Sequence, residues 1–324
     1  MAKRLLTVFG ATGNQGGAVI ETFLNHSTLS SQYSLRAITR NTSSAKAQAL
    51  ASKGVDLAVG DLNDRRSLET AIQGSYAVFA VTNYWETMSS PTEIQQGKNI
   101  ADAAVAAGVK HFVWSALPNV TKLTDGKLRA VEHFDGKSEV AHYLNSIKKD
   151  AGMLTTFFMP GFYMSNIKGM TRSNPAINDG TPTLTLPWNP EKTQVPLFNP
   201  AKDTGNFVGG ILGASDPTGL DGKWIQAVGE WSTPVKIVSE MSSMLGKEIK
   251  FNAVPAEVYK SFLPEAVAAE LTENMVLIRD YSYYGPGAEK QQSESDQILQ
   301  HLGLTTQSWK EFIEQDQKNG EWKF

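Results

Sequence analysis

A glycine-rich turn close to the N-terminus limits what this chain can fold into more than any other stretch. Residues 4–9 form an apolar run typical of a buried strand, and residues 18–24 have the pattern of a helix. Between them Gly10, Gly13 and Gly16 stand at every third position. Glycine tolerates a positive φ and lets a phosphate approach the backbone, and the N–H groups that begin the helix attract its charge. The stretch therefore predicts a dinucleotide site; the alternative is a tight turn without a ligand.

Short apolar runs alternate with amphipathic segments along the first half of the chain. This alternation predicts βαβ units, and therefore a parallel sheet with helices on both faces. Two βαβαβ halves make a Rossmann-type doubly wound α/β fold, in which ligands bind beyond the carboxyl ends of the strands where the halves meet. The further predicted strands are residues 34–38, 55–59, 76–81, 110–114 and 155–159, and the helices between them are residues 44–53, 65–73, 93–107 and 135–149.

The alternation of strands and helices weakens after residue 160. Residues 174–200 are rich in Pro, Thr and Asn and predict loops and short strands. We predict a dinucleotide-binding domain at residues 1–158, to which elements around residues 193–250 return. A smaller, mostly helical region at residues 159–192 and 251–324 would face the substrate or a partner. The helices predicted after residue 200 are 203–212, 233–245, 257–262, 265–279 and 309–317, and the strands are 223–228 and 249–254.

The composition excludes several classes of function. The chain has 30 Lys and Arg against 33 Asp and Glu, and its net charge of −3 argues against direct binding of nucleic acid. Cysteine is absent, which excludes disulfides and thiolate catalysis, and the five histidines are too dispersed to predict a metal site. No apolar run approaches the roughly 20 residues of a membrane span. The first residues lead straight into a strand, so we expect no signal peptide and a cytoplasmic location, with the nucleus as the alternative.

The end of the second predicted strand bears on the choice of cofactor. An acidic residue there would bind the ribose 2′-hydroxyl of NAD, whereas an arginine accommodates the 2′-phosphate of NADP. This chain has Thr39 and Arg40 with no acid close by, which favours NADP(H) over NAD(H). The alternative for Arg40 is a solvated side chain at a strand end. After the third strand, Asp61 and Leu62 could flank the adenine, although Asp61 could equally cap the next helix.

Two further strand ends point at the middle of such a cofactor. Thr82, Asn83 and Tyr84 follow the fourth predicted strand, and Ser115 follows the fifth. Each of them could contact the dinucleotide or serve only in a turn. Lys137 lies near the start of the helix that comes next, and it is the residue that matters most for a mechanism.

These residues resemble the short-chain dehydrogenase/reductase superfamily, in which a serine and a Tyr-x-x-x-Lys pair carry the chemistry. There the lysine binds the nicotinamide ribose and lowers the pKa of the tyrosine, which transfers the proton. In this chain His133 stands four residues before Lys137, and the tyrosine is absent. In this departure the chain resembles the NmrA-like family. It also resembles that family at residues 9–17 (FGATGNQGG), 133–137 (HFDGK) and 159–166 (MPGFYMSN). Members of this family bind NAD(P), often lack dehydrogenase activity, and include redox-sensing regulators as well as biosynthetic reductases and isomerases.

The resemblance implies a role for each matching position. Asn14, Gln15 and Gly16 would contact phosphate, Arg40 the 2′-phosphate and Lys137 the ribose, while residues 161–163 would lie beside the nicotinamide. The full set of predicted cofactor-binding residues is Gly10, Thr12, Gly13, Asn14, Gln15, Gly16, Arg40, Asp61, Leu62, Thr82, Asn83, Tyr84, Ser115, Lys137, Gly161, Phe162 and Tyr163.

Three functions are compatible with this pattern. The first is an NADP(H)-binding redox-sensing regulator with little or no turnover, whose partner would be a transcription factor, another protein or a second copy of the chain. The second is an NADPH-dependent reductase of a small carbonyl, enone or imine, with Lys137, Tyr163 and His133 as candidate catalytic residues. Histidine titrates near neutrality and could replace the tyrosine, although His133 could also simply begin a helix or pack beside it. The third is a cofactor-independent isomerase on the same scaffold.

Overall fold

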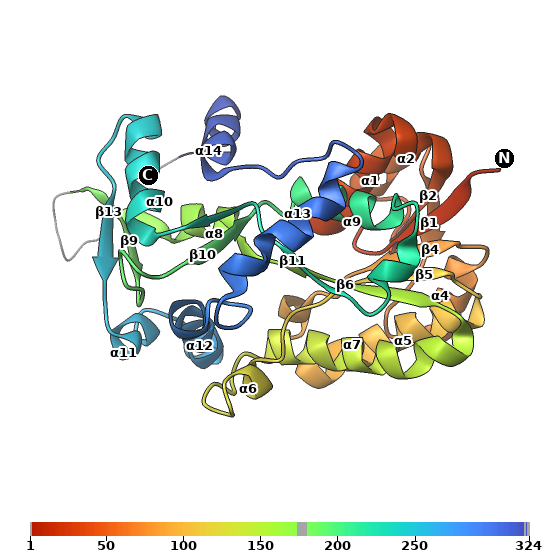
Figure 1. The fold of residues 1–324 in the computed structure, drawn as a ribbon, viewed down its shortest axis with the longest axis horizontal. Helices are drawn as coiled ribbons and strands as arrows, with labels where there is room; N and C mark the ends of the chain where they lie inside the picture. The colour runs from red at the N-terminus through yellow and green to blue at the C-terminus, as the bar shows by residue number, and fades with distance from the viewer. Residues whose placement is uncertain (1, 174–179, 321, 323–324) are drawn as a thin grey trace.

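A seven-stranded parallel sheet forms the centre of the protein in this computed structural model, which describes residues 2–173, 180–320 and 322 (Figure 1). The strand order is β3-β2-β1-β4-β5-β6-β11, and every neighbouring pair is parallel. The order reverses between β1 and β4, which is the switch point that the predicted Rossmann-type fold requires. The strands are β1 Arg4–Val8, β2 Tyr33–Thr39, β3 Asp56–Val59, β4 Ala77–Ala80, β5 His111–Ser115, β6 Leu154–Pro160 and β11 Trp224–Ala227.

Helices cover both faces of this sheet, above and below it in Figure 1. One face carries α1 Asn14–Asn25, α2 Ser27–Gln32 and α9 Asp203–Leu212; the other carries α4 Arg65–Ile72, α5 Ser90–Ala106 and α7 Glu132–Ala151. A separate hydrophobic core fills each side. The strands β4 and β5 are buried along their whole length, because a parallel sheet covered on both faces has no side exposed to water. The short helix α3, Ala45–Ala51, packs near β2 and β3 at the edge of the sheet.

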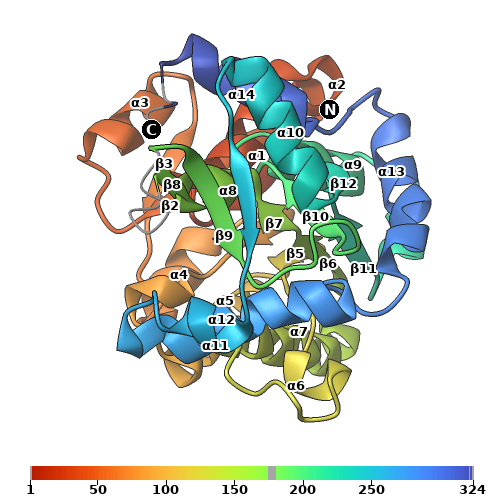
Figure 2. The same ribbon diagram turned by 90° about the vertical axis from the view of Figure 1, so that its left-hand side faces the viewer.

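The remainder of the chain builds a smaller part beyond the carboxyl ends of the strands, on the left in Figure 1 and facing the viewer in Figure 2. It contains two three-stranded sheets, β12-β10-β7 and β13-β9-β8, with helices packed around them. The strands are β7 Phe162–Tyr163, β8 Thr171–Ser173, β9 Pro182–Leu186, β10 Val195–Phe198, β12 Glu230–Ser232 and β13 Lys250–Ala253. The helices of the smaller part are α8 Met164–Met170, α10 Pro234–Leu245, α11 Ala256–Lys260, α12 Glu265–Tyr281 and α14 Trp309–Lys318. The other short helices are α6 Val120–Leu123, α13 Gln292–Gln300, η1 Tyr84–Glu86, η2 Pro217–Leu220 and η3 Ala288–Gln291.

The sequence-based elements of the central sheet agree with the structure to within a few residues. Two helices begin three residues earlier than predicted: α5 begins at Ser90, after a cap by the Ser89 side chain, and α7 begins at Glu132. The shift of α7 places His133 in its first turn. Of the loops and short strands predicted at residues 174–200, β9 and β10 are present, and residues 174–179 lie outside the described residues. The short strands β7, β8 and β12 and the helices α8 and α13 were not predicted, and the division into two domains stays a prediction.

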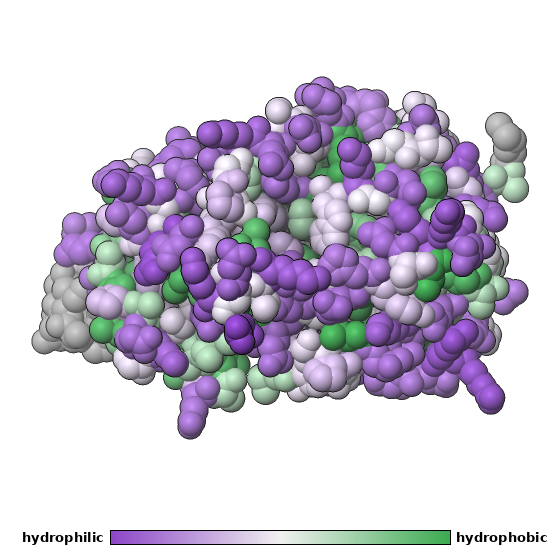
Figure 3. All heavy atoms as spheres, turned by 60° about the horizontal axis from the view of Figure 1, so that its bottom comes forward, coloured by the Kyte–Doolittle hydropathy of each residue, from purple (hydrophilic) through white to green (hydrophobic). Residues whose placement is uncertain are grey.

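The described part of the protein has a mainly polar surface on the side that Figure 3 shows. None of the helices in the described ranges is long and apolar enough to cross a bilayer. Figure 3, in which the lower side of Figure 1 comes forward, shows a mainly hydrophilic face with scattered hydrophobic residues. The most exposed large apolar side chain of the described residues is Phe262, next to α11, at 60% exposure.

The contact between α1 and α9 depends on a glycine. A Cβ added to Gly205 would lie 2.1 Å from the carbonyl oxygen of Ala18 and 2.3 Å from Oγ1 of Thr22. Both distances are far shorter than any real Cβ contact, so no larger side chain fits without moving a helix. Since α1 carries the glycine-rich turn at its N-terminal end, this packing helps to fix the position of that turn.

We expect the substitution Gly205→Ala to lower the free energy of unfolding by about 2 kcal/mol, because the added methyl group overpacks the interface between the two helices. Gly169→Ala is the matched control: Gly169 also lies in a helix, but a Cβ there would meet no atom within 4 Å. That change should leave the stability unchanged or raise it by up to about 1 kcal/mol, because alanine favours helix. Urea unfolding of the two variants measures both effects, and equal stabilities would contradict the close packing of α1 on α9.

Candidate functional site

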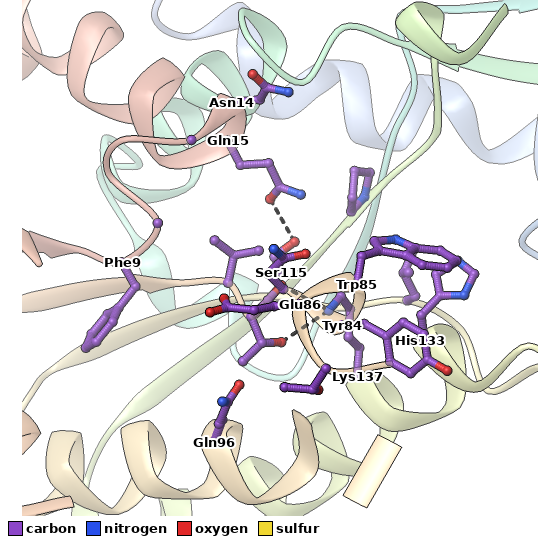
Figure 4. Close-up of a pocket in the computed structure, with 18 of the residues that line it drawn as sticks. Phe9, Asn14, Gln15, Tyr84, Trp85, Glu86, Gln96, Ser115, His133 and Lys137 are labelled. Carbon is purple, nitrogen blue, oxygen red and sulfur yellow. Dashed lines mark hydrogen bonds between the residues drawn. The ribbon is translucent and has the colours of Figure 1, made fainter. Parts of the chain in front are cut away.

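A pocket of about 870 Å³ lies across the carboxyl edge of the central sheet (Figure 4). It extends from the glycine-rich turn and the end of β2, past the ends of β4 and β5, to α7, α8 and α12. The predicted residues that line it are Gly10, Thr12, Gly13, Asn14, Gln15, Arg40, Asp61, Leu62, Thr82, Asn83, Tyr84, Ser115, His133, Lys137, Gly161, Phe162 and Tyr163. The structure therefore brings sequence-distant candidates to one cavity. Gly16 alone of the predicted set does not line it.

The glycine-rich turn needs its glycines for different reasons. Gly10 has a φ of +62°, and a Cβ on it would lie 2.7 Å from Cγ1 of Val81. A Cβ on Gly16 would lie 2.4 Å from the carbonyl oxygen of Gly10, so Gly16 allows α1 to pack against the turn rather than facing the pocket. The helix begins at Asn14 after Gly13, and no side chain caps it. The first N–H groups of α1 are thus left for an anionic group in the pocket.

Gln15 connects three elements around the pocket. The hydroxyl of Ser115 donates a hydrogen bond to Oε1 of Gln15 at 2.8 Å (Figure 4), and Nε2 of Gln15 donates to the hydroxyl of Tyr163 at 2.7 Å. The amide thereby holds together the start of α1, the end of β5 and the strand β7. Its side chain is committed to the architecture of the site, which leaves the neighbouring Thr12 and Asn14 to face a ligand.

The end of the pocket at β2 carries an exposed charge pair. The side chain of Arg40 is 71% exposed and forms an ion pair with Glu86 of η1. Asp61 does not cap the following helix, because Asp64 takes that role by accepting a hydrogen bond from the backbone N–H of Arg66. The carboxylate of Asp61 instead accepts the N–H of Asn63 within its own turn.

A buried ion pair lies under the middle of the pocket. The ammonium of Lys137 contacts the carboxylate of Glu93 and donates to Oγ1 of Thr82 at 3.1 Å, and Thr82 donates to Glu93 at 2.7 Å. The side chains of Lys137 and Glu93 are 10% and 1% exposed. The sequence indicated Lys137 as a site residue but not Glu93. A buried acidic residue on an amphipathic helix cannot be distinguished in the sequence from an acidic residue that faces water.

His133 also lines the pocket and is held by a residue of the smaller part. Its Nδ1 lies 2.6 Å from Oε1 of Glu270 on α12, and its backbone N–H donates to the same oxygen at 3.0 Å. The rings of Tyr84 and Trp85 pack against the imidazole, with centroids 5.8 and 5.1 Å away (Figure 4). Nothing in the sequence indicated Glu270 or Trp85 as site residues.

The tyrosines of the pocket hold their protons tightly. Burial raises the pKa of Tyr163, and burial together with the carboxylates of Glu270 and Glu132 raises the pKa of Tyr84. Tyr283, which also lines the pocket, has a pKa raised well above its ordinary value by burial, and its hydroxyl donates to the carbonyl of Pro160. Since the cation of Lys137 is paired with Glu93, no cation of the described pocket is positioned to lower these pKa values.

The chain matches the sequence pattern of the NmrA-like family over residues 2–313. The NmrA-like family domain-containing oxidoreductase hkm9 of Aspergillus hancockii is 29% identical over 295 residues, which cover 87% of this chain and 85% of that protein. The NmrA-like family domain-containing oxidoreductase ptmS of Penicillium ochrochloron is 31% identical over 266 residues, which cover 78% of this chain and 76% of that protein.

Several solved structures share the fold. NmrA, a negative transcriptional regulator, has a TM-score of 0.78 to this chain in its complex with NADP, at 22% identity over 99% of this chain and 98% of NmrA. Its complex with NAD gives the same TM-score and identity. The triphenylmethane reductase of Citrobacter sp. in complex with NADP(H) has a TM-score of 0.71 at 21% identity over 96% of this chain and 99% of that protein. At such identities the likeness shows the fold alone.

The buried ion pair leads to a prediction about stability. Lys137→Met leaves the carboxylate of Glu93 buried without its cation, which should lower the free energy of unfolding by about 3 kcal/mol or more. The double variant with Lys137→Met and Glu93→Gln removes both charges and should recover most of that loss. Urea unfolding at neutral pH measures both variants. If the single and double variants are equally stable, the two side chains do not form the buried pair.

Proposed function

Because the chain belongs to the NmrA-like family, we propose that it is an NADP(H)-dependent oxidoreductase that reduces a small carbonyl, enone or imine compound. The observation that carries this proposal is the single pocket that joins the glycine-rich turn to His133 and Lys137. Relatives that are about 30% identical over most of their length bear the name oxidoreductase, which supports the same conclusion. The proposal thus puts the second of the sequence-based hypotheses before the regulator.

The pocket fits a dinucleotide in one direction. The uncapped N-terminus of α1 suits the pyrophosphate, and Gly13, which has no side chain, would let the pyrophosphate approach the backbone. The adenosine ribose would then lie at the end of β2, beside Arg40, and the nicotinamide would extend past Ser115 toward Lys137 and Phe162. In this placement most of the predicted cofactor residues would contact the dinucleotide, whereas the Gln15 side chain and Gly16 would act through the packing of the site.

The choice of NADP over NAD is part of the proposal and rests on Arg40. Its guanidinium is exposed at the mouth of the pocket, where it can turn from Glu86 to a 2′-phosphate. No acidic residue occupies the end of β2. The fold does not decide the preference, because NmrA is described in complexes with both cofactors.

The residues around the nicotinamide end would have different roles in a reduction. When bound, NADPH supplies a hydride to the substrate. Lys137, at the floor of the pocket, can donate to a ribose hydroxyl while Glu93 and Thr82 hold its ammonium in place. Phe162 and Met275 also line the pocket, and their buried apolar side chains would help to exclude water from the reacting groups.

A redox-sensing regulator stays the second candidate, and one observation favours it. The tyrosine that would transfer a proton is replaced by His133, and the tyrosines that remain hold their protons tightly. Under this hypothesis the bound dinucleotide would change the loop around η1, where Trp85 and Met88 are 44% and 52% exposed, and so alter a surface for another protein. No feature of the described residues favours a cofactor-independent isomerase.

The cofactor preference can be measured directly. Calorimetry should show that Arg40→Ala weakens the binding of NADPH by about tenfold or more, because a charge-assisted contact with phosphate is lost, and leaves the binding of NADH unchanged. Arg66→Ala is the control, since Arg66 is exposed and lies outside the pocket. Equal losses for both dinucleotides, or none for either, would show that Arg40 does not select the cofactor.

Turnover separates the two candidate functions. We expect NADPH to be oxidised in the presence of a panel of carbonyl, enone and imine compounds. The loss of NADPH absorbance measures this oxidation. A panel that produces no oxidation, with NADPH binding intact, would favour the regulator.

A further inference from the structure

We propose that His133 and Glu270 form a proton-donating pair that fits this pocket to a neutral carbonyl compound. The inference rests on the proposed oxidoreductase function and assigns two residues and a substrate class within it. Glu270 comes from α12 of the smaller part, and neither the sequence pattern nor the relatives' names assign it a role. His133 would donate the proton, and Glu270 would act as a positioning residue behind it.

The geometry of the pair fixes the imidazole. Oε1 of Glu270 accepts from Nδ1 of His133 at 2.6 Å and from its backbone N–H at 3.0 Å, so one carboxylate oxygen holds both the ring and its backbone. The side chains are 14% and 10% exposed, which keeps water from competing for the contact. With Nδ1 committed to Glu270, the other ring nitrogen, Nε2, has no protein hydrogen-bond partner in the described part of the chain. This arrangement leaves Nε2 as the ring nitrogen that can act on a ligand, since His133 lines the pocket.

The other acids of the pocket are poorly suited to this task. The hydroxyl of Tyr283 donates to the carbonyl of Pro160, and the hydroxyl of Tyr163 is held by Gln15. Tyr84 lies against Glu132, a carboxylate that disfavours the loss of its proton. Lys137 is neutralised by Glu93. His133 is therefore the one acid among the described lining residues whose residue type ordinarily titrates near neutrality.

Charged and titratable groups face His133 from several elements. Glu270 approaches from α12, Glu132 precedes it on α7, and Tyr84 lies beside it from η1. The only cation of the described pocket close to it in sequence is Lys137, one turn further along α7, and that ammonium is paired with Glu93. Although burial raises the pKa of Glu270, the hydrogen bond and charge of His133 bring it below its ordinary value, so the carboxylate stays ionised at neutral pH.

The pair distinguishes between classes of substrate by proton balance. In the reduction of a neutral carbonyl, the hydride from NADPH forms the new C–H bond and the π electron pair of the C=O bond moves to oxygen. That oxygen takes the proton from Nε2 of the imidazolium, which leaves neutral histidine and an alcohol, and solvent returns the proton. A cationic acceptor such as an iminium ion takes the hydride and needs no proton. A proton donor held this firmly is thus of use for a neutral carbonyl.

The test compares two kinds of acceptor in one protein. The probes are a panel of aromatic aldehydes and α-diketones, led by para-nitrobenzaldehyde, and the cationic triphenylmethane dye malachite green, which accepts a hydride alone. Glu270→Gln should lower the ratio of carbonyl to dye turnover by about tenfold or more. Glu273→Gln is the matched control on the same helix, because Glu273 also accepts backbone N–H groups, those of Arg129 and Ala130, and its variant should leave the ratio unchanged.

A second variant keeps the comparison informative. His133→Gln should lower the ratio at least as far as Glu270→Gln, and the double variant should lower it no further than His133→Gln alone, because the two residues act as one unit. Carbonyl turnover of the native protein should fall as the pH rises and His133 loses its proton, and in Glu270→Gln this fall should begin at a lower pH.

A readout that needs no turnover checks the pair itself. In NMR titrations, with His133 assigned from the spectrum of His133→Gln, the Glu270→Gln variant should lower the titration midpoint of His133 by about one pH unit or more. An unchanged midpoint, or a ratio that falls equally in Glu273→Gln, overturns the inference while leaving the oxidoreductase function standing. Turnover of the dye but of no carbonyl also overturns it. If neither kind of probe oxidises NADPH, the oxidoreductase function itself fails, and the role of the pair fails with it.

Discussion

The buried pair of Lys137 and Glu93 is the contact on which the arrangement of the site depends. Two helices must approach closely to form it, and glycines on both of them permit this. A Cβ on Gly97 of α5 would lie 2.5 Å from the side chain of Val140 on α7, and a Cβ on Gly136 would lie 3.2 Å from Oε2 of Glu93. Because the pair also holds the end of β4 through Thr82, it fixes how α7 is rotated against the sheet. The rotation of α7 in turn decides that His133, one turn earlier, lines the pocket.

Much of the fold could be predicted from the sequence because its signals are local. The glycine spacing at the first turn and the alternation of apolar strands with amphipathic helices led to the correct central sheet. Strands of two or three residues, such as β7 Phe162–Tyr163 and β12 Glu230–Ser232, are too short for a period to show. The candidate site divides in the same way: Lys137 was found by its motif, but Glu93 and Glu270 become site residues only through contacts 44 and 137 residues away along the chain.

The contact between His133 and Glu270 changes the conclusion drawn from the replacement of the expected tyrosine by His133. In the sequence the substitution indicated a protein that binds a dinucleotide but transfers no hydride. In the structure the position holds a titratable group with its own carboxylate partner, which is an arrangement that serves proton transfer well. Loss of a motif residue and loss of the chemistry are therefore separate questions, and the partner of the substituted residue decides between them.

The distance along the chain between His133 and Glu270 also sets an order of assembly. A ribosome adds the 137 residues between them in roughly ten seconds, whereas local helices and small sheets form within milliseconds. During that interval the glycine-rich turn, α5 and α7 have all been synthesised, but the wall that α12 supplies does not yet exist. A nascent chain can thus form the part of the pocket around the glycine-rich turn well before it can form the part that α12 lines.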